Sequence, residues 1–268
     1  MVEPFHLGSD GLLRLAAWEK RWPGLAVGMT TRDLGNMAFR PDERVHDVTE
    51  RREKLAERLG FSFAGFTFAQ QVHGTGVQVV DGSQRGRGMR DAGHAIPETD
   101  GLSTGLKETV LSLFFADCVP IYFFAPNRGV IALAHAGWRG STQNMAARML
   151  EHFRKVWLIQ PDGVWVAIGP SIGGCCYQVD APVVDAVQRV LPDGTEEVCC
   201  PQGEGKWLLD LKALNRRLLV RAGVPPSHIS VSQYCTACRT DLFYSYRKEG
   251  PKAGRMLAWI GQKEGDGR

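Results

Sequence analysis

Three side chains able to bind a soft metal ion lie at the ends of expected strands. They are His73, Cys118 and His135, and each is close to a glycine or a proline. Side chains at such positions can converge at one edge of a sheet. Two imidazoles and one thiolate form a zinc site with a fourth position open to water or substrate, which is typical of catalytic zinc. The alternative is that Cys118 and His135 are core residues, because free cysteine is among the most buried residue types.

Asp117 counts against that alternative. It lies in the apolar run 110–125, directly before Cys118. Burying an unpaired carboxylate costs several kcal/mol, so we expect Asp117 to be paired, hydrogen-bonded or near a metal ion.

The elements that must position these residues follow from the apolar pattern. The continuous apolar runs VLSLFFA and IYFFAP flank residues 117–120 and indicate two buried strands joined by a tight connection. The segment FTFAQQVHGTGVQVVD predicts two strands that meet at 73–76, with His73 at a strand end. Further strands are expected in VWVAIG, HISVSQY and RMLAWIG.

Helices are expected between these strands. The strand GVIALAHAG passes through the turn 137–140 into Ser141 and Thr142, which we expect to cap a helix. Two more helices are expected from about Asp180 and after Asp210, and residues 42–59 predict an amphipathic helix whose charge run 50–54 faces solvent. Residues 83–99 predict a long loop of the kind that can act as a lid, with mostly solvated arginines at positions 85, 87 and 90.

The order of these elements favours an α+β fold, a single domain over residues 1–268 with mixed β-sheets and flanking helices. A hydrophobic content of 44% and a charged content of 23% are typical of globular proteins. The net charge of +3 is too small to indicate a nucleic acid or an anionic membrane as the main partner. The run 110–125 is too short and too polar to cross a bilayer.

The cysteines indicate a reducing environment. Seven is an odd number, and the N-terminal residues lack the apolar core of a signal peptide, so we expect a cytoplasmic protein with reduced thiols. The adjacent pairs 175–176 and 199–200 are expected to be buried thiols that do not share one metal ion. Cys235 and Cys238 have zinc-ribbon or redox spacing, but no second such pair follows, which favours a structural role.

Several local strings resemble one family. They are QQVHG at 70–74, TDGLST at 99–104, ADCVP at 116–120, AHAGWRGS at 134–141, IGPSIGGCCY at 168–177, LDLKALNRRLL at 209–219 and FYSYR at 243–247. This pattern is similar to that of the laccase-domain family, first described as multicopper polyphenol oxidases. Its members are now regarded as zinc-dependent purine nucleoside phosphorylases with adenosine deaminase side activity, and some are called peptidoglycan editing factors. The resemblance implies a fold like that of the cysteine hydrolases.

The resemblance also implies roles for individual residues. His73, Cys118 and His135 match the family's zinc ligands, with copper as another metal for this donor set. The expected substrates are phosphate and a purine nucleoside such as inosine, guanosine, adenosine or methylthioadenosine. Arg139, at a turn before a helix, and Arg247 are the candidates for holding phosphate. Asp117 would orient a ligand histidine or act as general acid or base.

Three other functions stay open at this point. Cys118 and His135 could be the nucleophile and base of a hydrolase that edits a cell-wall precursor. Two histidines and one cysteine could also hold copper for phenol oxidation, although that reaction needs further copper centres. The fourth candidate is a binding module without turnover. The sequence leaves the preferred nucleoside and the oligomeric state undetermined.

Overall fold

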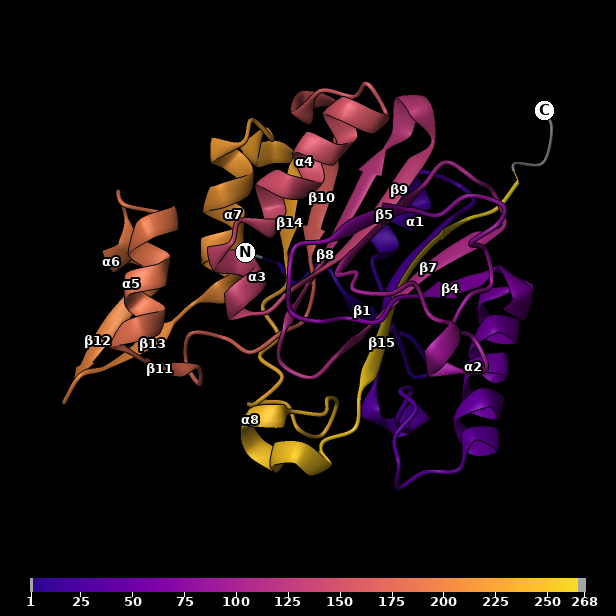
Figure 1. Cartoon of the computed structure of the whole chain (residues 1–268), viewed down its shortest axis with the longest axis horizontal. Helices are drawn as coiled ribbons and strands as arrows, with labels where there is room; N and C mark the ends of the chain where they lie inside the picture. The colour runs from indigo at the N-terminus through magenta and orange to yellow at the C-terminus, as the bar shows by residue number, and fades with distance from the viewer. Residues whose placement is uncertain (1, 265–268) are drawn as a thin grey trace.

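Two six-stranded sheets form the centre of the molecule (Figure 1). The computed structural model describes residues 2–264. The first sheet contains, in spatial order, β1 (His6–Leu7), β2 (Leu12–Arg14), β3 (Leu25–Thr30), β15 (Met256–Gln262), β7 (Thr109–Phe115) and β4 (Phe66–Phe68). The second contains β14 (Ile229–Val231), β10 (Trp165–Ile168), β8 (Val119–Ala125), β9 (Val130–Ala136), β6 (Gly101–Thr104) and β5 (Val77–Val79). A small sheet contains β11 (Gln178–Asp180), β13 (Lys206–Leu209) and β12 (Cys199–Gly203).

Helices cover the outer faces of the two large sheets. Figure 1 shows α2 on one side of the sheets and α4 and α7 on the other. The α-helices of the described residues are α1 (Ala16–Arg21), α2 (Val45–Leu59), α3 (Trp138–Thr142), α4 (Met145–Val156), α5 (Ala181–Val190), α6 (Thr195–Val198), α7 (Leu211–Arg221) and α8 (Tyr246–Glu249). The expected α+β fold with flanking helices is therefore confirmed, whereas the domain boundaries 1–268 stay a prediction.

Strand β8 shows why the central apolar runs are continuous. Its residues Tyr122 and Phe124 belong to the apolar cluster between the two sheets, together with Leu111 and Leu113 of β7. Its alternate residues, such as Phe123, belong to the cluster shared with α4 and α7. Because both faces of the strand are buried, both sets of side chains must be apolar. The expectation of two buried strands flanking residues 117–120 is confirmed.

The connection between β7 and β8 carries the chain from the first sheet to the second. In the antiparallel register of β8 and β9, Val119 lies opposite Ala136 and Pro120 lies opposite His135. Cys118, directly before β8, therefore lies at the same end of the second sheet as His135. The fold thus brings together two residues that are 17 positions apart in the chain.

Two local expectations were wrong. The strands expected to meet at 73–76 exist as β4 and β5, but they lie in different sheets, because the chain crosses between the sheets there. His73 accordingly lies in a loop. Ser141 and Thr142 lie inside α3, and α4 is capped by Asn144, whose side chain accepts a hydrogen bond from the amide of Ala147 at 3.2 Å. The short α3 begins directly after β9, so the cap of the next helix falls later in the chain.

The charge run 50–54 is only partly solvated, because Arg52 is 1% exposed. Its guanidinium donates to the carbonyls of Met37, Gly88 and Met89 and lies 4.0 Å from the ring centre of Phe39. The helices expected at Asp180 and Asp210 are confirmed as α5 and α7. The N-terminal strands β1 to β3 and the pair β12 and β13 were not predicted. No helix of residues 2–264 is long and apolar enough to span a membrane.

Candidate metal centre and cavity

The side chains of His73, Cys118 and His135 meet at the end of the second sheet. Their ligand atoms all lie within 4.8 Å of one another. The two imidazole rings are 4.8 Å apart, centre to centre, and nearly perpendicular. A Cβ atom at Gly137 would lie 3.0 Å from the Sγ of Cys118 and 3.3 Å from the His73 ring, so a side chain there would crowd both residues. The structure brings together all three residues expected to bind a metal ion.

Asp100 positions two of these three residues, although sequence reasoning missed it. Its fully buried carboxylate accepts a hydrogen bond from Nδ1 of His135 at 2.8 Å, which leaves Nε2 free to face a metal ion. It also accepts bonds from the amides of His73 at 3.1 Å and Gly74 at 2.8 Å. These bonds hold His73 at a left-handed φ of 60°, which a non-glycine residue rarely adopts. The signal in the sequence was a lone acidic residue within TDGLST.

The charges of Cys118 and His135 stabilise each other. Burial raises the pKa of the Cys118 thiol, but the facing His135 and the hydrogen bonds of both histidines outweigh it, so its pKa falls to about 6. Burial lowers the pKa of His135, whereas the Cys118 thiolate and the Asp100 carboxylate raise it to about 9. Burial likewise opposes ionisation of Asp100, yet its bond with His135 keeps its pKa below the ordinary value. In the metal-free site these opposite shifts favour a thiolate beside an imidazolium near neutral pH.

Asp117 lies beside the centre but is bonded to another segment. It is 8% exposed and has a left-handed φ of 82°. Its carboxylate accepts hydrogen bonds from Thr236 Oγ1 at 2.5 Å, Ser245 Oγ at 3.0 Å and the amide of Arg247 at 2.7 Å. We expected Asp117 to orient a ligand histidine or to act as general acid or base. Among residues 2–264, the carboxylate that hydrogen-bonds one of the two candidate ligand histidines is that of Asp100. Asp117 thus fixes the segment 236–247 against the metal centre.

A cavity of about 850 Å³ is lined in part by the three candidate ligands His73, Cys118 and His135. That volume is typical of a site for a small organic molecule. Its lining contains four arginines, Arg52, Arg139, Arg247 and Arg255, and one acidic residue, Asp117. It also contains six aromatic residues, Phe39, Phe68, Phe114, Trp138, Tyr177 and Tyr246. The walls are thus suited to an anion and to a flat ring.

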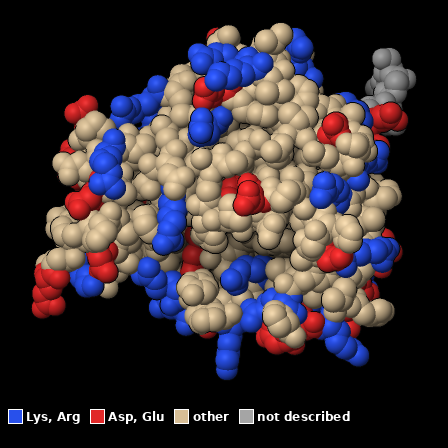
Figure 2. Space-filling model, viewed as in Figure 1, with Lys and Arg blue, Asp and Glu red and all other residues tan. Residues whose placement is uncertain are grey.

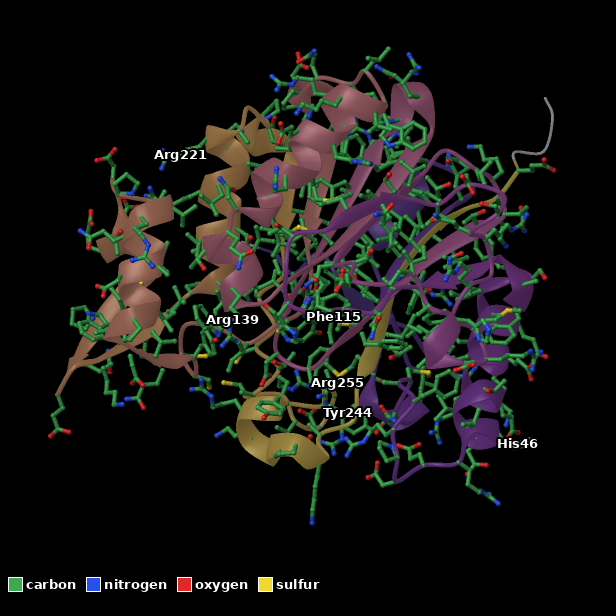
Figure 3. All side chains as sticks on the ribbon, viewed as in Figure 1. His46, Phe115, Arg139, Arg221, Tyr244 and Arg255 are labelled. Atoms are coloured by element: carbon green, nitrogen blue, oxygen red, sulfur yellow. The ribbon has the colours of Figure 1, made fainter. Side chains whose placement is uncertain are left out.

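The cationic groups of the cavity come from distant segments. Figure 3 labels Arg139, on α3, and Arg255, which lies just before β15 and close to α8. On the face drawn in Figure 2, Lys and Arg side chains gather around the α8 region. Arg139 stacks on Trp138 at 4.4 Å, and Arg247 stacks on Tyr177 at 4.9 Å and donates to the carbonyl of Gln178. Sequence reasoning found Arg139 and Arg247 but missed Arg52 and Arg255.

The three arginines of the loop 83–99 are not among the residues that line the cavity. Arg85 donates to the carbonyl of Glu108, Arg87 donates to that of His94, and Arg90 pairs with Glu53. The loop itself contributes Gly88, Ala92, Gly93 and Ala95 to the cavity wall. It therefore covers the cavity with small residues rather than with charge.

The cysteines outside this centre differ from the expectation of buried thiols. Cys199 is buried, but Cys175, Cys200 and Cys238 are exposed. All seven cysteines are free. The Sγ atoms of Cys175, Cys176, Cys235 and Cys238 lie within 4.8 Å of one another. The adjacent pair 175–176 and the spaced pair Cys235 and Cys238, which we considered separately in the sequence, therefore form one cluster.

The comparisons with known proteins agree with this geometry. A family model described as multi-copper polyphenol oxidoreductase laccase matches residues 16–263, and the chain belongs to this family. It is 41% identical to purine nucleoside phosphorylase YlmD of Geobacillus stearothermophilus, with 98% of this chain and 99% of the relative covered. It is 36% identical to the protein of the same name in Bacillus subtilis, with 97% and 98% covered.

Solved structures show the same fold. The crystal structure of YlmD from Geobacillus stearothermophilus superimposes with a TM-score of 0.94 at 41% identity and covers 98% of this chain and 100% of that chain. A Bacillus licheniformis hypothetical protein, YfiH, superimposes with a TM-score of 0.93 at 34% identity, with the same coverage. The resemblance stated from the sequence motifs is confirmed.

Proposed function

We propose that this protein is a zinc-dependent purine nucleoside phosphorylase, in which phosphate cleaves the bond between a purine and its ribose. The observation that carries the proposal is a three-ligand metal centre at the base of a cavity lined by arginine and aromatic side chains. The relatives named purine nucleoside phosphorylase support it. The substrates would be inosine, guanosine, adenosine and methylthioadenosine, with deamination of adenosine as a side activity.

The metal ligands in this proposal are His73, Cys118 and His135. The donor set, the close approach at Gly137 and the bond from His135 Nδ1 to Asp100 all fit a metal ion. Two nitrogens and one sulfur suit zinc, and copper is the other metal that this set can hold. When bound, the ion supplies Lewis acidity and a template for phosphate or water.

The chain itself supplies charge and orientation for the reaction. Arg139 and Arg247 have exposed guanidinium groups on the cavity wall, and we assign them to the phosphate. Their aromatic partners Trp138 and Tyr177 offer faces on which a purine can stack. Phosphorolysis passes through an oxocarbenium-like state, so the positions of phosphate and purine relative to the ribose decide the rate.

We assign the two buried carboxylates to different tasks. Asp100 orients His135 and fixes the loop of His73. Asp117 remains the candidate general acid or base of the cavity, and it also anchors the segment of Arg247 through the amide of that residue. An Asp117→Asn variant should lose turnover while it keeps its metal. Unchanged turnover and zinc content would exclude a role in proton transfer.

A specific observation favours a second candidate. The thiolate of Cys118 beside the imidazolium of His135 is the pair that a cysteine hydrolase uses. Such an enzyme would edit a cell-wall precursor by amide hydrolysis without metal. The two functions are separable because a metal ion would coordinate the Cys118 thiolate in the phosphorylase, whereas the thiolate would be free to react in the hydrolase.

The test combines metal analysis with phosphate-dependent release of hypoxanthine or adenine from inosine and adenosine. Protein purified without added metal should carry zinc, and Cys118→Ala should reduce turnover on the order of 10³-fold, because a bound metal stabilises a transition state by several kcal/mol. A Cys200→Ala variant, at an exposed cysteine, is the matched control.

Three results would point to the other functions. Metal-free protein that turns over no nucleoside but loses amidase activity when Cys118 is alkylated would establish the hydrolase. Bound copper with oxidation of phenols would establish the oxidase. Bound zinc without turnover of any nucleoside would leave a binding module.

A further inference from the structure

Four thiols meet at a place separate from the metal centre. Cys175 and Cys176 lie in the turn that follows β10, and Cys235 and Cys238 lie in the turn that follows β14. The two turns are joined by a backbone bridge between Ser171 and Cys235. The fold thus pairs two cysteine segments that are about 60 residues apart, which spacing along the chain does not reveal.

The distances between the sulfur atoms match one tetrahedral ion. A zinc ion with four bonds of about 2.3 Å to sulfur places its ligands about 3.8 Å apart. The Sγ of Cys238 lies 3.4 Å from that of Cys176 and 3.6 Å from that of Cys175. All four Sγ atoms lie within 4.8 Å of one another. The Sγ atoms of the adjacent residues Cys175 and Cys176 therefore lie in one cluster, although the sequence led us to expect that such a pair would not share one metal ion.

The surroundings of the cluster favour the thiolate of one of its members, Cys235, and lower the pKa of that thiol. The amide of Gly173 donates to the Sγ of Cys235 at 3.2 Å, a bond that favours the thiolate. Lys212 is buried, with 6% of the residue exposed, and its ammonium group donates to the carbonyl of Tyr234 at 2.7 Å. Burial lowers the pKa of Lys212 below its ordinary value, and the charges of Asp210, Cys235, Glu3 and Cys175 offset this only in part. Lys212 is thus a buried cation whose charge interacts with Cys235 and Cys175, and a cation there favours their thiolates.

Hydrogen bonds and neighbouring residues connect the cluster to the cavity. Thr236, next to Cys235, donates to Asp117, and the amide of Ile172 donates to the carbonyl of Asp117. On the other turn, Tyr177 follows Cys176 and lines the cavity. An ion shared by the two turns would therefore fix both the anchor of Asp117 and the wall that carries Tyr177.

We infer that Cys175, Cys176, Cys235 and Cys238 bind a second zinc ion, which holds two cavity-forming turns together. Four protein ligands fill a tetrahedral coordination sphere, and this is the arrangement of structural zinc. Binding releases the remaining thiol protons to solvent and changes no oxidation state. The inference does not depend on the proposed reaction.

The test is zinc stoichiometry in a set of variants of the full chain. Zinc per chain is measured by mass spectrometry of metals in wild type, Cys118→Ser, Cys238→Ser, the double variant and Cys200→Ser. Cys238 is chosen because it is exposed and because both short sulfur contacts involve it. The expected zinc content per chain is two in wild type and in Cys200→Ser, one in Cys118→Ser and in Cys238→Ser, and zero in the double variant. Circular dichroism and thermal unfolding check that each variant is folded.

Zinc K-edge absorption of Cys118→Ser gives an independent readout. It should report four sulfur neighbours at about 2.3 Å and no nitrogen. Thiol alkylation of native wild type should spare the four cluster cysteines until a chelator is added. Should Cys238→Ser be poorly folded, these two measurements on chains with an intact cluster still decide the matter.

The outcomes separate this inference from the proposed function. One zinc per chain that persists in Cys118→Ser and is lost in Cys238→Ser supports the cluster and refutes the cavity metal. Wild type with a single zinc that Cys118→Ser removes would overturn the inference. A disulfide between cluster cysteines, or alkylation of all four at the rate of Cys200, would overturn it as well.

Discussion

The two groups of candidate metal ligands in this protein differ in their ligand atoms and in the contacts that support them. His73, Cys118 and His135 offer two nitrogens and one sulfur at the base of a cavity of about 850 Å³. The cluster of Cys175, Cys176, Cys235 and Cys238 offers four sulfurs between two turns. Three ligands leave a position for substrate, whereas four leave none. The number of protein ligands thus distinguishes a site suited to a reaction from one suited to holding chain segments together.

The supports differ as well. A fully buried carboxylate, Asp100, orients the first group, whereas a backbone amide, that of Gly173, donates to the second. The two groups nevertheless share Asp117, which precedes Cys118 and accepts a bond from Thr236 beside Cys235. Substitutions can therefore be chosen that affect one group and spare the other.

The largest expected effect comes from Asp100→Asn. Because this carboxylate bonds His135 and the loop of His73, its loss should weaken zinc binding at the cavity by about 10- to 100-fold and leave the four-cysteine cluster unchanged. Competition with a fluorescent chelator measures both affinities. The matched control is Asp91→Asn, which removes an exposed aspartate that bonds His94 at 2.7 Å. Equal loss at both zinc sites would contradict a local role for Asp100.

The next effect concerns the reactivity of Cys118 in metal-free protein. Its thiol pKa of about 6 means that the thiolate predominates above pH 6 and is lost as the pH falls below it. Alkylation of Cys118 should therefore level off above pH 6 and slow by about tenfold per unit below it. Peptide mass spectrometry measures the rate.

Two changes sharpen this pH dependence. His135→Asn removes the imidazolium that favours the thiolate, so the midpoint should rise toward about 8.5, the value of an ordinary cysteine. Zinc should protect Cys118 throughout the range. A midpoint near 8.5 in the wild type would show that the thiolate and imidazolium pair does not form.

The smallest effects are expected from two glycine substitutions, one for each group. A Cβ at Gly137 would lie 3.0 Å from Cys118 Sγ, and one at Gly173 would lie 3.2 Å from Cys175 Sγ. Such crowding costs about 1–3 kcal/mol, so Gly137→Ala should weaken zinc at the cavity by about tenfold and Gly173→Ala should do so at the cluster. Each variant is the control for the other. Loss of both zinc ions in either variant would mean that the two groups fold as one unit.

The sequence predicted the parts of the molecule that depend on local pattern. The apolar runs around 117–120 indicated two buried strands, and His73, Cys118 and His135 stood out as ligand types beside glycine or proline at strand ends. Their convergence followed because the register of β8 and β9 places Cys118 and His135 at the same end.

Features that depend on tertiary contacts could not be predicted in this way. Arg52 lies in a charged helical run, and its burial depends on three carbonyls and on aromatic rings from other segments. The role of Asp100 depends on the loop of His73 folding over it. The four-cysteine cluster requires two turns to meet across β10 and β14, which pair in parallel. The chain shows at most a residue type or a spacing for these contacts, such as the lone acidic residue in TDGLST or the pair Cys235 and Cys238, and never the partner segment.

The most direct test of the central claim is a crystal structure of the zinc-loaded protein with inosine and phosphate, with anomalous diffraction measured at the zinc edge. We expect one peak bonded to His73, Cys118 and His135 with its fourth position open to the cavity, and a second peak bonded to four sulfurs. The phosphate should contact Arg139 or Arg247. A covalent adduct on Cys118 with no zinc beside His135 would contradict the account.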